Sequence, residues 1–333
     1  MLFDYVSLAG GLVVLIIAGD ILVRGSVGIA QRLGIPNLVI GLTIVAFGTS
    51  APELVISLKA ALSGSGGIAI GNVVGSNIAN VLLVLGMPAL IAATPCGEEG
   101  ATKNAIFMVA ISVVFTILCF FSPIGLMGSL ILLALLAVFL GDSARAALQH
   151  RKERKAAAAT AAEAQEDDDD DELEDVEGVP DAVAVAGVYI VLGLIGLPLG
   201  AHFTINGATS VAQDWGVSDA VIALTVIALG TSLPELATTV MAAIRQHGAV
   251  AIGNVIGSNV FNLLAIIGIT TAIVPVEVPA EILKLDIWVM LACAVLLLVL
   301  AAKKICLGRM SGFVLTAAYV LYISVVYYLS ATI

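Results

Sequence analysis

Two glutamates stand in stretches of the sequence that are otherwise uncharged and almost wholly apolar. Glu53 ends the motif GTSAPE, and Glu235 ends the motif GTSLPE. Thr49 lies four residues before Glu53, so on a helix their hydroxyl and carboxylate groups share one face. Pro52 lacks a backbone N–H and is expected to bend or break that helix, which frees a carbonyl oxygen beside them. Together these oxygen atoms could bind a cation.

A second polar motif follows each glutamate, as GNVVGSNIAN at 71–80 and GNVIGSNVFN at 253–262. In the first copy Asn72, Ser76 and Asn80 are spaced by four residues, which places them in a polar stripe on one side of a helix. All of these side chains offer oxygen, and no His or Cys accompanies them. Oxygen ligands favour hard cations such as calcium or sodium over zinc or copper.

The composition is that of an integral membrane protein. Hydrophobic residues make up 60% of the chain, charged residues make up 12%, and the mean hydropathy is +1.11. A soluble domain has about 45–50% apolar and about 25% charged residues. A carboxylate in the middle of a bilayer costs about 3 kcal/mol on insertion scales and therefore marks a functional site. Neither motif includes a base that would give Glu53 or Glu235 a purely structural ion pair.

Ten apolar runs are long enough for helices that cross a bilayer, which takes about 20 residues. The runs are continuous rather than alternating, so transmembrane helices are favoured over a β-barrel. We therefore predict an all-α integral membrane fold of ten transmembrane helices, with spans at about 5–31, 37–62, 67–93, 104–121, 123–141, 183–211, 218–244, 248–274, 285–302 and 311–330.

The chain contains an internal repeat. Residues 39–86 align without a gap with residues 221–268 at a constant offset of 182 (235 − 53), and the shared positions include both glutamate motifs. Each copy belongs to a group of five predicted spans, and because five is odd, the second copy enters the membrane from the opposite side. Inverted repeats with Gly/Pro-interrupted segments are typical of secondary transporters that bind their substrate near the midplane.

A charged segment separates the two groups of spans. Residues 163–181 hold twelve of the 25 acidic residues, which is typical of a solvated linker. We predict a first five-helix repeat at 1–141, a disordered basic and acidic linker at 142–182, and a second five-helix repeat at 183–333. With the N-terminus outside, twelve of the 14 Lys and Arg residues lie at cytoplasmic ends. The positive-inside rule then places both termini outside and the linker in the cytoplasm of a multi-pass cell (inner) membrane protein.

The doubled motif resembles the two alpha-repeats of the cation/calcium exchanger superfamily, close to its prokaryotic sodium/calcium exchangers. The resemblance implies a secondary antiporter rather than an enzyme, which exchanges calcium for sodium by alternating access as the first and sixth spans slide across the other eight. We expect no cofactor, no nucleic acid and no obligate protein partner, only the two ions and the lipid bilayer. The resemblance assigns calcium binding to Glu53, Glu235, Thr49 and Thr231, and coupling-ion binding to the same two glutamates with Ser50, Ser76, Asn80, Ser232, Ser258 and Asn262.

One position departs from that family pattern, because Asn262 stands where well-described members have an aspartate. Asparagine keeps an oxygen but removes a charge, which leaves two carboxylates in the site. Two carboxylates match one calcium ion, two sodium ions or two protons, so calcium and the coupling ion would exclude each other. A calcium/proton antiporter of the same fold therefore stays open as an alternative. A cation channel is disfavoured, because a pore usually needs rings of groups around an axis.

Overall fold

The computed structural model describes residues 2–164, 179–180, 182–216 and 228–331. The acidic part of the predicted linker and the first residues of the predicted span 218–244 lie outside them. Nearly all of the described chain is helical, as its continuous runs of Leu, Ile, Val and Ala predict. The first half contains α1 (Leu2–Leu33), α2 (Asn37–Ile40), the π-helical η1 (Gly41–Val45), α3 (Ala46–Thr49), α4 (Ala51–Leu62), α5 (Gly66–Ala79), the π-helical η2 (Asn80–Val84), α6 (Gly86–Ile91), β1 (Thr94–Pro95), α7 (Ala101–Phe120) and α8 (Leu126–Ala164).

The second half repeats much of this order. It contains α9 (Val183–Asp214), α11 (Ala228–Gly230), α12 (Leu233–Ile244), α13 (Gly248–Phe261), the π-helical η4 (Asn262–Ile266), α14 (Ile267–Ile273), α15 (Ala280–Lys284), α16 (Asp286–Ala302), β2 (Cys306–Leu307) and α17 (Arg309–Ala331). Helices α5 and α13 lie at the centre of the bundle, and α13 is buried over almost its whole length.

Seven spans among the described residues are long and apolar enough to cross a membrane, and the bent pair Asn37–Thr49 and Ala51–Leu62 would make an eighth. These correspond to eight of the ten predicted spans. The predicted span 218–244 begins outside the described residues, and the span 285–302 coincides with α16, which has only 17 residues. The described chain is thus an all-α membrane protein, and the full set of ten spans stays a prediction.

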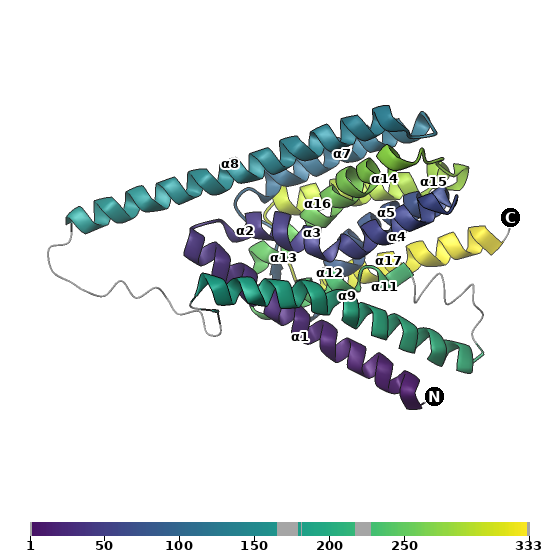
Figure 1. Cartoon of the computed structure of the whole chain (residues 1–333), viewed down its shortest axis with the longest axis horizontal. Coiled ribbons are helices and arrows are strands. Elements are labelled where there is room, and N and C mark those ends of the chain that lie inside the picture. The colour runs from purple at the N-terminus through teal and green to yellow at the C-terminus, as the bar shows by residue number, and fades with distance from the viewer. Residues whose placement is uncertain (1, 165–178, 181, 217–227, 332–333) are drawn as a thin grey trace.

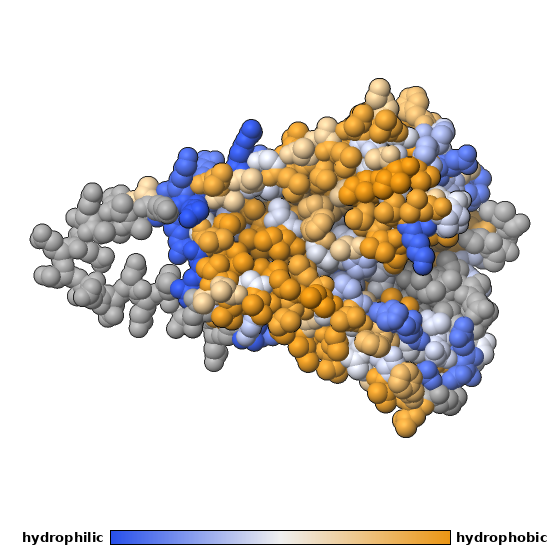
Figure 2. Space-filling view, viewed as in Figure 1, coloured by the Kyte–Doolittle hydropathy of each residue, from blue (hydrophilic) through white to orange (hydrophobic). Residues whose placement is uncertain are grey.

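The surface supports this assignment. Figure 2 shows a broad apolar band across the molecule, with hydrophilic side chains gathered toward its two ends. Exposed Leu, Ile, Val and Phe side chains of α1, α7, α8, α9 and α17 contribute to the apolar surface. Apolar surface on this scale marks a membrane-facing or protein-binding face rather than a solvated one. In Figure 1 the start of α1 and the end of α17 lie at one end of the molecule, opposite the end of α8, as an even number of crossings requires.

Helix α8 is longer than the sequence suggested, because it does not end near residue 141. It continues to Ala164, through the basic beginning of the segment 142–182. Alanine, which is frequent there, has the highest helix propensity, and the Arg154 guanidinium donates to the backbone carbonyl of Gln31 at 2.7 Å. The first part of this segment is therefore helical rather than disordered, and it is tied to the end of α1.

Helices α1 and α9 lie side by side along their length (Figure 1) and run antiparallel. Gly11 of α1 lies against Gly200 of α9, whereas Leu22, three turns further along α1, lies against the earlier Gly193 of α9. Small residues of this kind let two membrane helices approach closely. The two helices occupy equivalent places in the two repeats, so their opposite directions are those that inverted copies would have.

Two short backbone pairings relate the ends of the two halves. The strand β1 pairs antiparallel with β2, with Thr94 opposite Leu307, and a separate bridge joins Ile124 to Val276. The offset of 182 converts 94 into 276 and 124 into 306, so the bridge is the repeat-related counterpart of the strand pair to within one residue of register. The two halves therefore contact each other reciprocally.

A substitution in α9 tests the close contact between α1 and α9. A Cβ atom at Gly193 would lie 2.6 Å from the Cβ atom of Leu22, and overpacking of this kind costs about 1–3 kcal/mol. We expect Gly193→Ala to lower the melting temperature of the purified protein in detergent by several degrees. Gly187→Ala on the same helix is the matched control, because a Cβ atom there meets nothing within 4 Å. Equal melting temperatures for the two variants would contradict the contact.

Candidate functional site

The GTSAPE motif breaks a membrane helix, as its proline predicts. Helix α3 ends at Thr49, α4 begins at Ala51, and the two parts are bent by 44° around Ser50. Pro52 lies in the first turn of α4, where its missing N–H has no helical partner to lose. The second motif has the same local form, since Ser232 precedes α12 with backbone angles within a few degrees of those of Ser50.

The serine and glutamate of each motif are spaced as in a helix capping box, yet neither serine side chain caps its helix. Instead, the Ser50 hydroxyl donates to Glu235 Oε1 across the two repeats at 3.2 Å. Glu53 and Glu235 are each 1% exposed, and their Oε2 atoms have no hydrogen-bond partner among the described residues. Two such carboxylates are costly to bury without a positive charge. The local geometry therefore favours a cation between them.

The helix that follows each glutamate contributes one more buried oxygen that has no hydrogen-bond partner among the described residues. Asn80 and Asn262 open the π-helical turns η2 and η4 and are each 1% exposed. Asn80 Nδ2 donates to Asn259 Oδ1 at 3.1 Å, and Asn262 Nδ2 donates to Asn77 Oδ1 at 3.0 Å. The Oδ1 atoms of Asn80 and Asn262 are left without a partner in the described part of the chain. Single π-turns are frequent at functional sites.

Two more asparagines brace the glutamate helices. Asn72 Nδ2 donates to the Ser57 hydroxyl at 3.0 Å and lies 3.4 Å from the backbone carbonyl of Glu53. Asn254 Nδ2 makes the equivalent contacts to the Thr239 hydroxyl at 3.0 Å and the Glu235 carbonyl at 3.4 Å. These bonds hold α4 against α5 and α12 against α13. They therefore fix the position of Glu53 relative to Asn80, and of Glu235 relative to Asn262.

The structure buries every predicted site residue. The set comprises Thr49, Ser50, Glu53, Ser76, Asn80, Thr231, Ser232, Glu235, Ser258 and Asn262, and each is at most 8% exposed. Hydrogen bonds join Ser50 to Glu235, and the Thr49 hydroxyl lies 3.5 Å from that of Ser258. The Ser232 hydroxyl is buried without a partner among the described residues. Ser76 and Thr231 are also buried, and within the described ranges no side-chain hydrogen bond links them to the other predicted site residues.

The sequence pattern assigned no role to five residues that contribute here. Asn77 lies beside the polar stripe of Asn72, Ser76 and Asn80; Asn259 is its counterpart in the second copy, and Asn254 is the counterpart of Asn72. Their identity at the 182 offset was the signal that could have placed them in the site. Met108 and Met290, whose sulfur atoms accept hydrogen bonds from Asn259 and Asn77, lie on helices without any polar motif. They too are separated by 182 residues.

An ion pair joins α1 to the end of α12. The Arg245 guanidinium contacts the Asp20 carboxylate, and Arg24 lies 3.5 Å from the same group. Asp20 corresponds to His202 at the repeat offset, and His202 instead lies 3.0 Å from Asn206 within α9. The two halves are therefore asymmetric here, with a charged contact at only one of the two equivalent positions.

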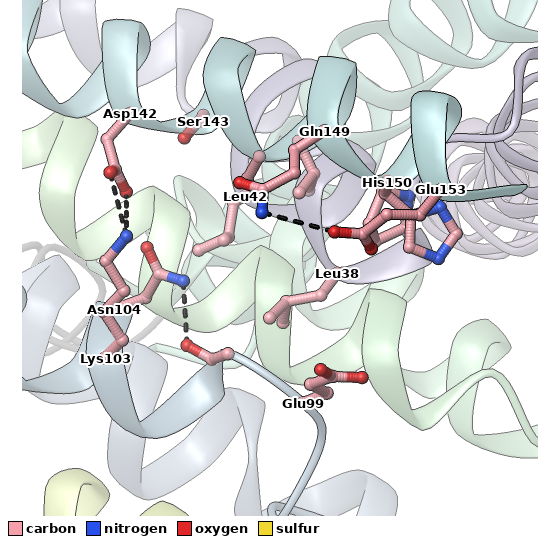
Figure 3. A pocket seen from close by; sticks show the side chains of 14 residues that line it. Leu38, Leu42, Glu99, Lys103, Asn104, Asp142, Ser143, Gln149, His150 and Glu153 are labelled. Atoms are coloured by element: carbon pink, nitrogen blue, oxygen red, sulfur yellow. Dashed lines mark hydrogen bonds and ion pairs between the residues drawn. The ribbon is translucent and has the colours of Figure 1, made fainter. Parts of the chain in front are cut away.

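A surface cavity of about 330 Å³ is lined by other residues, and Figure 3 shows their side chains. It is formed by the start of α2, the start of α7 and the part of α8 that extends past residue 141. Its Asp142 carboxylate is already paired with the Lys103 ammonium at 2.7 and 2.8 Å. None of the predicted site residues lines it. An exposed cavity with a resident base is less suited to a metal cation than the buried carboxylate pair.

Known proteins provide an independent comparison. The family model described as sodium/calcium exchanger protein matches residues 3–141 and 185–328. The sodium/calcium exchanger MaX1 of Methanosarcina acetivorans is 33% identical, over 98% of this chain and 99% of its own. The inner membrane protein YrbG of Escherichia coli is 31% identical, over 99% and 98% of the two chains.

A solved structure has the same fold. The sodium-calcium exchanger NCX_Mj, soaked with sodium and strontium, superposes with a TM-score of 0.79 and 28% identity, and the match covers 97% of this chain and 98% of that one. The family model, the full-length relatives and the fold agree with the doubled motif and with the buried carboxylate pair. The chain belongs to the sodium/calcium exchanger protein family.

Proposed function

We propose that this protein is an antiporter that exchanges calcium for sodium across the membrane by alternating access. Membership of the family makes it a secondary transporter rather than an enzyme. The observation that carries the proposal is the set of buried, unpartnered oxygens of Glu53, Glu235, Asn80 and Asn262, contributed equally by the two repeats. The names of MaX1 and NCX_Mj, each a sodium and calcium exchanger, support the same pair of ions.

The charge of the site explains why the exchange would be obligatory. Glu53 and Glu235 are the two acidic groups at its centre, and among the described residues no base pairs with either. One calcium ion or two sodium ions neutralise two carboxylates, whereas both together would leave excess positive charge in a medium of low dielectric constant. Calcium and sodium therefore exclude each other from the site. If the protein changes access only when the two carboxylates are neutralised, it must exchange calcium for sodium.

The ligands follow from the residues that surround the carboxylates. Calcium has a preference for six to eight oxygen ligands at about 2.3–2.6 Å, which the hydroxyls and amides near the glutamates can help to supply. We assign calcium to Glu53, Glu235, Thr49 and Thr231, and the coupling ions to the same glutamates with Ser50, Ser76, Asn80, Ser232, Ser258 and Asn262.

Helices α1 and α9 are suited to the moving part. A Cβ atom on Gly48 would overlap with Leu194 of α9, and one on Gly230 would overlap with Ile205 of the same helix. Helix α9 thus covers the break points of both glutamate helices. If α1 and α9, held together by their glycine-lined contact, slide as a pair across the other eight spans, these side chains move off the breaks and open the site to one side at a time.

We further propose the topology that the sequence predicts. Ten spans would form two inverted five-helix repeats at 1–141 and 183–333, with both termini outside and the segment 142–182 in the cytoplasm of a cell (inner) membrane. The antiparallel packing of α1 on α9 and the reciprocal backbone pairings support the inverted relation. The name of YrbG as an inner membrane protein supports the location.

One observation favours a second candidate, a calcium/proton antiporter of the same fold. Asn262 provides an amide where well-described family members provide a carboxylate, so this site lacks one negative charge. Asn262 also uses its amide nitrogen to donate to Asn77 at 3.0 Å, which an ionised aspartate could not do. Two buried glutamates can accept two protons as well as two sodium ions, and the charge balance is the same in both cases.

Calcium flux in proteoliposomes distinguishes these functions. We expect the purified full-length protein to take up calcium when sodium is loaded inside and diluted outside, because outward sodium movement vacates the carboxylates for calcium. We expect little uptake when sodium is equal on both sides and only a proton gradient is imposed. The measurement is radioactive calcium accumulated over time under each gradient.

The outcomes separate the alternatives. Uptake that follows the proton gradient and ignores sodium would replace the sodium antiporter by the proton antiporter. Uptake driven by the calcium gradient alone, with no countertransported ion, would indicate a channel. Vesicles without protein serve as the control for leakage.

A further inference from the structure

We propose that Met108 and Met290 are positioning residues, whose sulfur atoms fix the orientation of the Asn259 and Asn77 amides and thereby direct the Oδ1 atoms of Asn80 and Asn262 toward the bound cation. The inference rests on the proposed cation site at Glu53 and Glu235. It concerns residues on α7 and α16, neither of which carries a predicted ligand.

The contact between methionine and asparagine occurs twice, at equivalent positions. Asn259 Nδ2 lies 3.5 Å from Met108 Sδ, and Asn77 Nδ2 lies 4.0 Å from Met290 Sδ. Met108 is 0% exposed and Met290 is 2% exposed. Both pairs are related by the repeat offset, since 290 − 108 and 259 − 77 are each 182. A pairing that recurs in both copies is a feature of the site rather than an accident of packing.

The chemistry of sulfur determines which way each amide points. A thioether has no hydrogen to donate and can only accept, and Asn77 Nδ2 also lies 3.4 Å from the backbone carbonyl of Asn259, a second acceptor. If the Asn77 amide turned over, its oxygen would face two acceptors and both hydrogen bonds would be lost. The side chain is therefore held with Nδ2 toward Met290 and Oδ1 toward Asn262.

This orientation passes to the next amide. Because Asn77 presents Oδ1, Asn262 must donate its Nδ2, which it does at 3.0 Å, and its own Oδ1 is left free. The second chain runs from Met108 through Asn259 to Asn80, whose Nδ2 donates at 3.1 Å and whose Oδ1 is likewise free. Each series of hydrogen bonds begins at a methionine sulfur, which only accepts, and ends at an asparagine Oδ1, which also accepts. Both series therefore present an oxygen to the site, as a cation requires.

Leucine tests the role of the sulfur, because it fills nearly the same volume but accepts no hydrogen bond. We expect Met108→Leu and Met290→Leu each to weaken calcium binding about two- to twelvefold, the range for loss of one hydrogen bond worth about 0.5–1.5 kcal/mol. The melting temperature and the maximal uptake rate should stay near those of the parent protein. Calcium titration calorimetry on the purified full chain gives the affinity, and proteoliposome uptake gives the rate and KM.

Met241→Leu is the control for the change of side chain. Met241 is partly buried among apolar side chains, whereas Met108 and Met290 are fully buried, and it has no hydrogen bond to an asparagine amide in the described chain. A second test is a double-mutant cycle. Met290→Leu should have no further effect on affinity in an Asn77→Ala background, whereas it should add to Asn259→Ala, which interrupts only the other chain.

Unchanged calcium affinity in both methionine variants, or equal losses for Met241→Leu, would overturn the inference, and so would additive effects of Met290→Leu and Asn77→Ala. Failure of the proposed function looks different. In that case the parent protein itself shows no exchange under either gradient, while direct calcium titration of the parent and of the variants still decides whether the sulfur atoms position the site.

Discussion

Glu53→Gln and Glu235→Gln are each expected to abolish calcium transport while the protein still folds. Each change removes one of the two charges that neutralise calcium and places an amide N–H₂ group where only acceptors can bind a cation. Removing one partner of a buried charge pair costs about 3–5 kcal/mol, which corresponds to a loss of calcium affinity of roughly 150- to 5,000-fold. The measurement is calcium uptake into proteoliposomes, together with calcium titration of the purified variants.

Thermal stability gives the same prediction a second readout. In the parent protein Glu53 and Glu235 are both buried with an unpartnered oxygen, so calcium should raise the melting temperature by binding the folded state. Each glutamine variant should lose this response, because its site no longer binds the ion. Its melting temperature without calcium should not fall, because one buried charge has been removed.

Glu281→Gln provides the matched control. Glu281 is exposed in the short helix α15, outside the site, and its replacement should leave both transport and the calcium response unchanged. Normal transport by either site variant would show that the carboxylate pair does not hold calcium. A loss of folding in both variants would also contradict the expectation, because it would make the glutamates structural.

The sequence alone predicted the parts of this site that depend on a local rule. A proline inside an apolar helix must break it, and the structure has the break at Ser50. The exact recurrence of the motif 182 residues later predicts that Glu53 and Glu235 share one site. Ser50 of the first motif donates to Glu235 of the second at 3.2 Å, and the shared ion site stays a prediction. The apolar segments around both glutamates predicted that they are buried. The absence of a basic residue from either motif predicted that they have no ion pair there.

Other parts could not be predicted, because they depend on contacts between distant segments. The crossed bonds from Asn80 to Asn259 and from Asn262 to Asn77 join the two repeats, whereas the pattern of a single helix shows only that these residues share a face or lie near it. The π-helical turns at Asn80 and Asn262 have no marker in the apolar residues that follow them. A buried methionine resembles any other apolar residue until its neighbour is known.

The length of α8 was missed for a different reason. The prediction of disorder for 142–182 rests on the charge of the segment, which combines a basic, alanine-rich part after residue 141 with the acidic run that follows it. Alanine favours helix strongly even in a solvated segment, and the helix is held by the bond from Arg154 to Gln31. Composition averaged over 142–182 therefore does not reveal that the described residues up to Ala164 are helical.

The second prediction with a large expected effect concerns Asn262→Asp, which adds a third carboxylate to the site. An ionised aspartate cannot donate to Asn77 Oδ1, so the bond of 3.0 Å is replaced by repulsion between two acceptors. Two responses relieve it: the new carboxylate binds a further cation, or it takes up a proton. Both make transport depend more steeply on the coupling ion.

We expect Asn262→Asp to carry about one more monovalent cation per calcium ion than the parent protein, because electroneutrality at a buried site counts charges. The measurement is the reversal potential of calcium flux in proteoliposomes at fixed sodium, proton and calcium gradients, from which the number of charges per cycle follows. At saturating calcium and low sodium the variant should also transport more slowly than the parent, since its extra charge is then uncompensated.

Asn80→Asp separates a specific effect from a general one. Asn80 occupies the equivalent position of the first repeat and donates to Asn259 Oδ1 at 3.1 Å, so its replacement adds the same charge at the same depth with the same loss of a hydrogen bond. If only Asn262→Asp changes the reversal potential, position 262 sets the stoichiometry of coupling. Equal changes in both variants would mean that the site responds to total charge alone. An unchanged reversal potential in Asn262→Asp would contradict the prediction, because a residue that is 1% exposed and carries an added charge needs one more countercharge in each transport cycle.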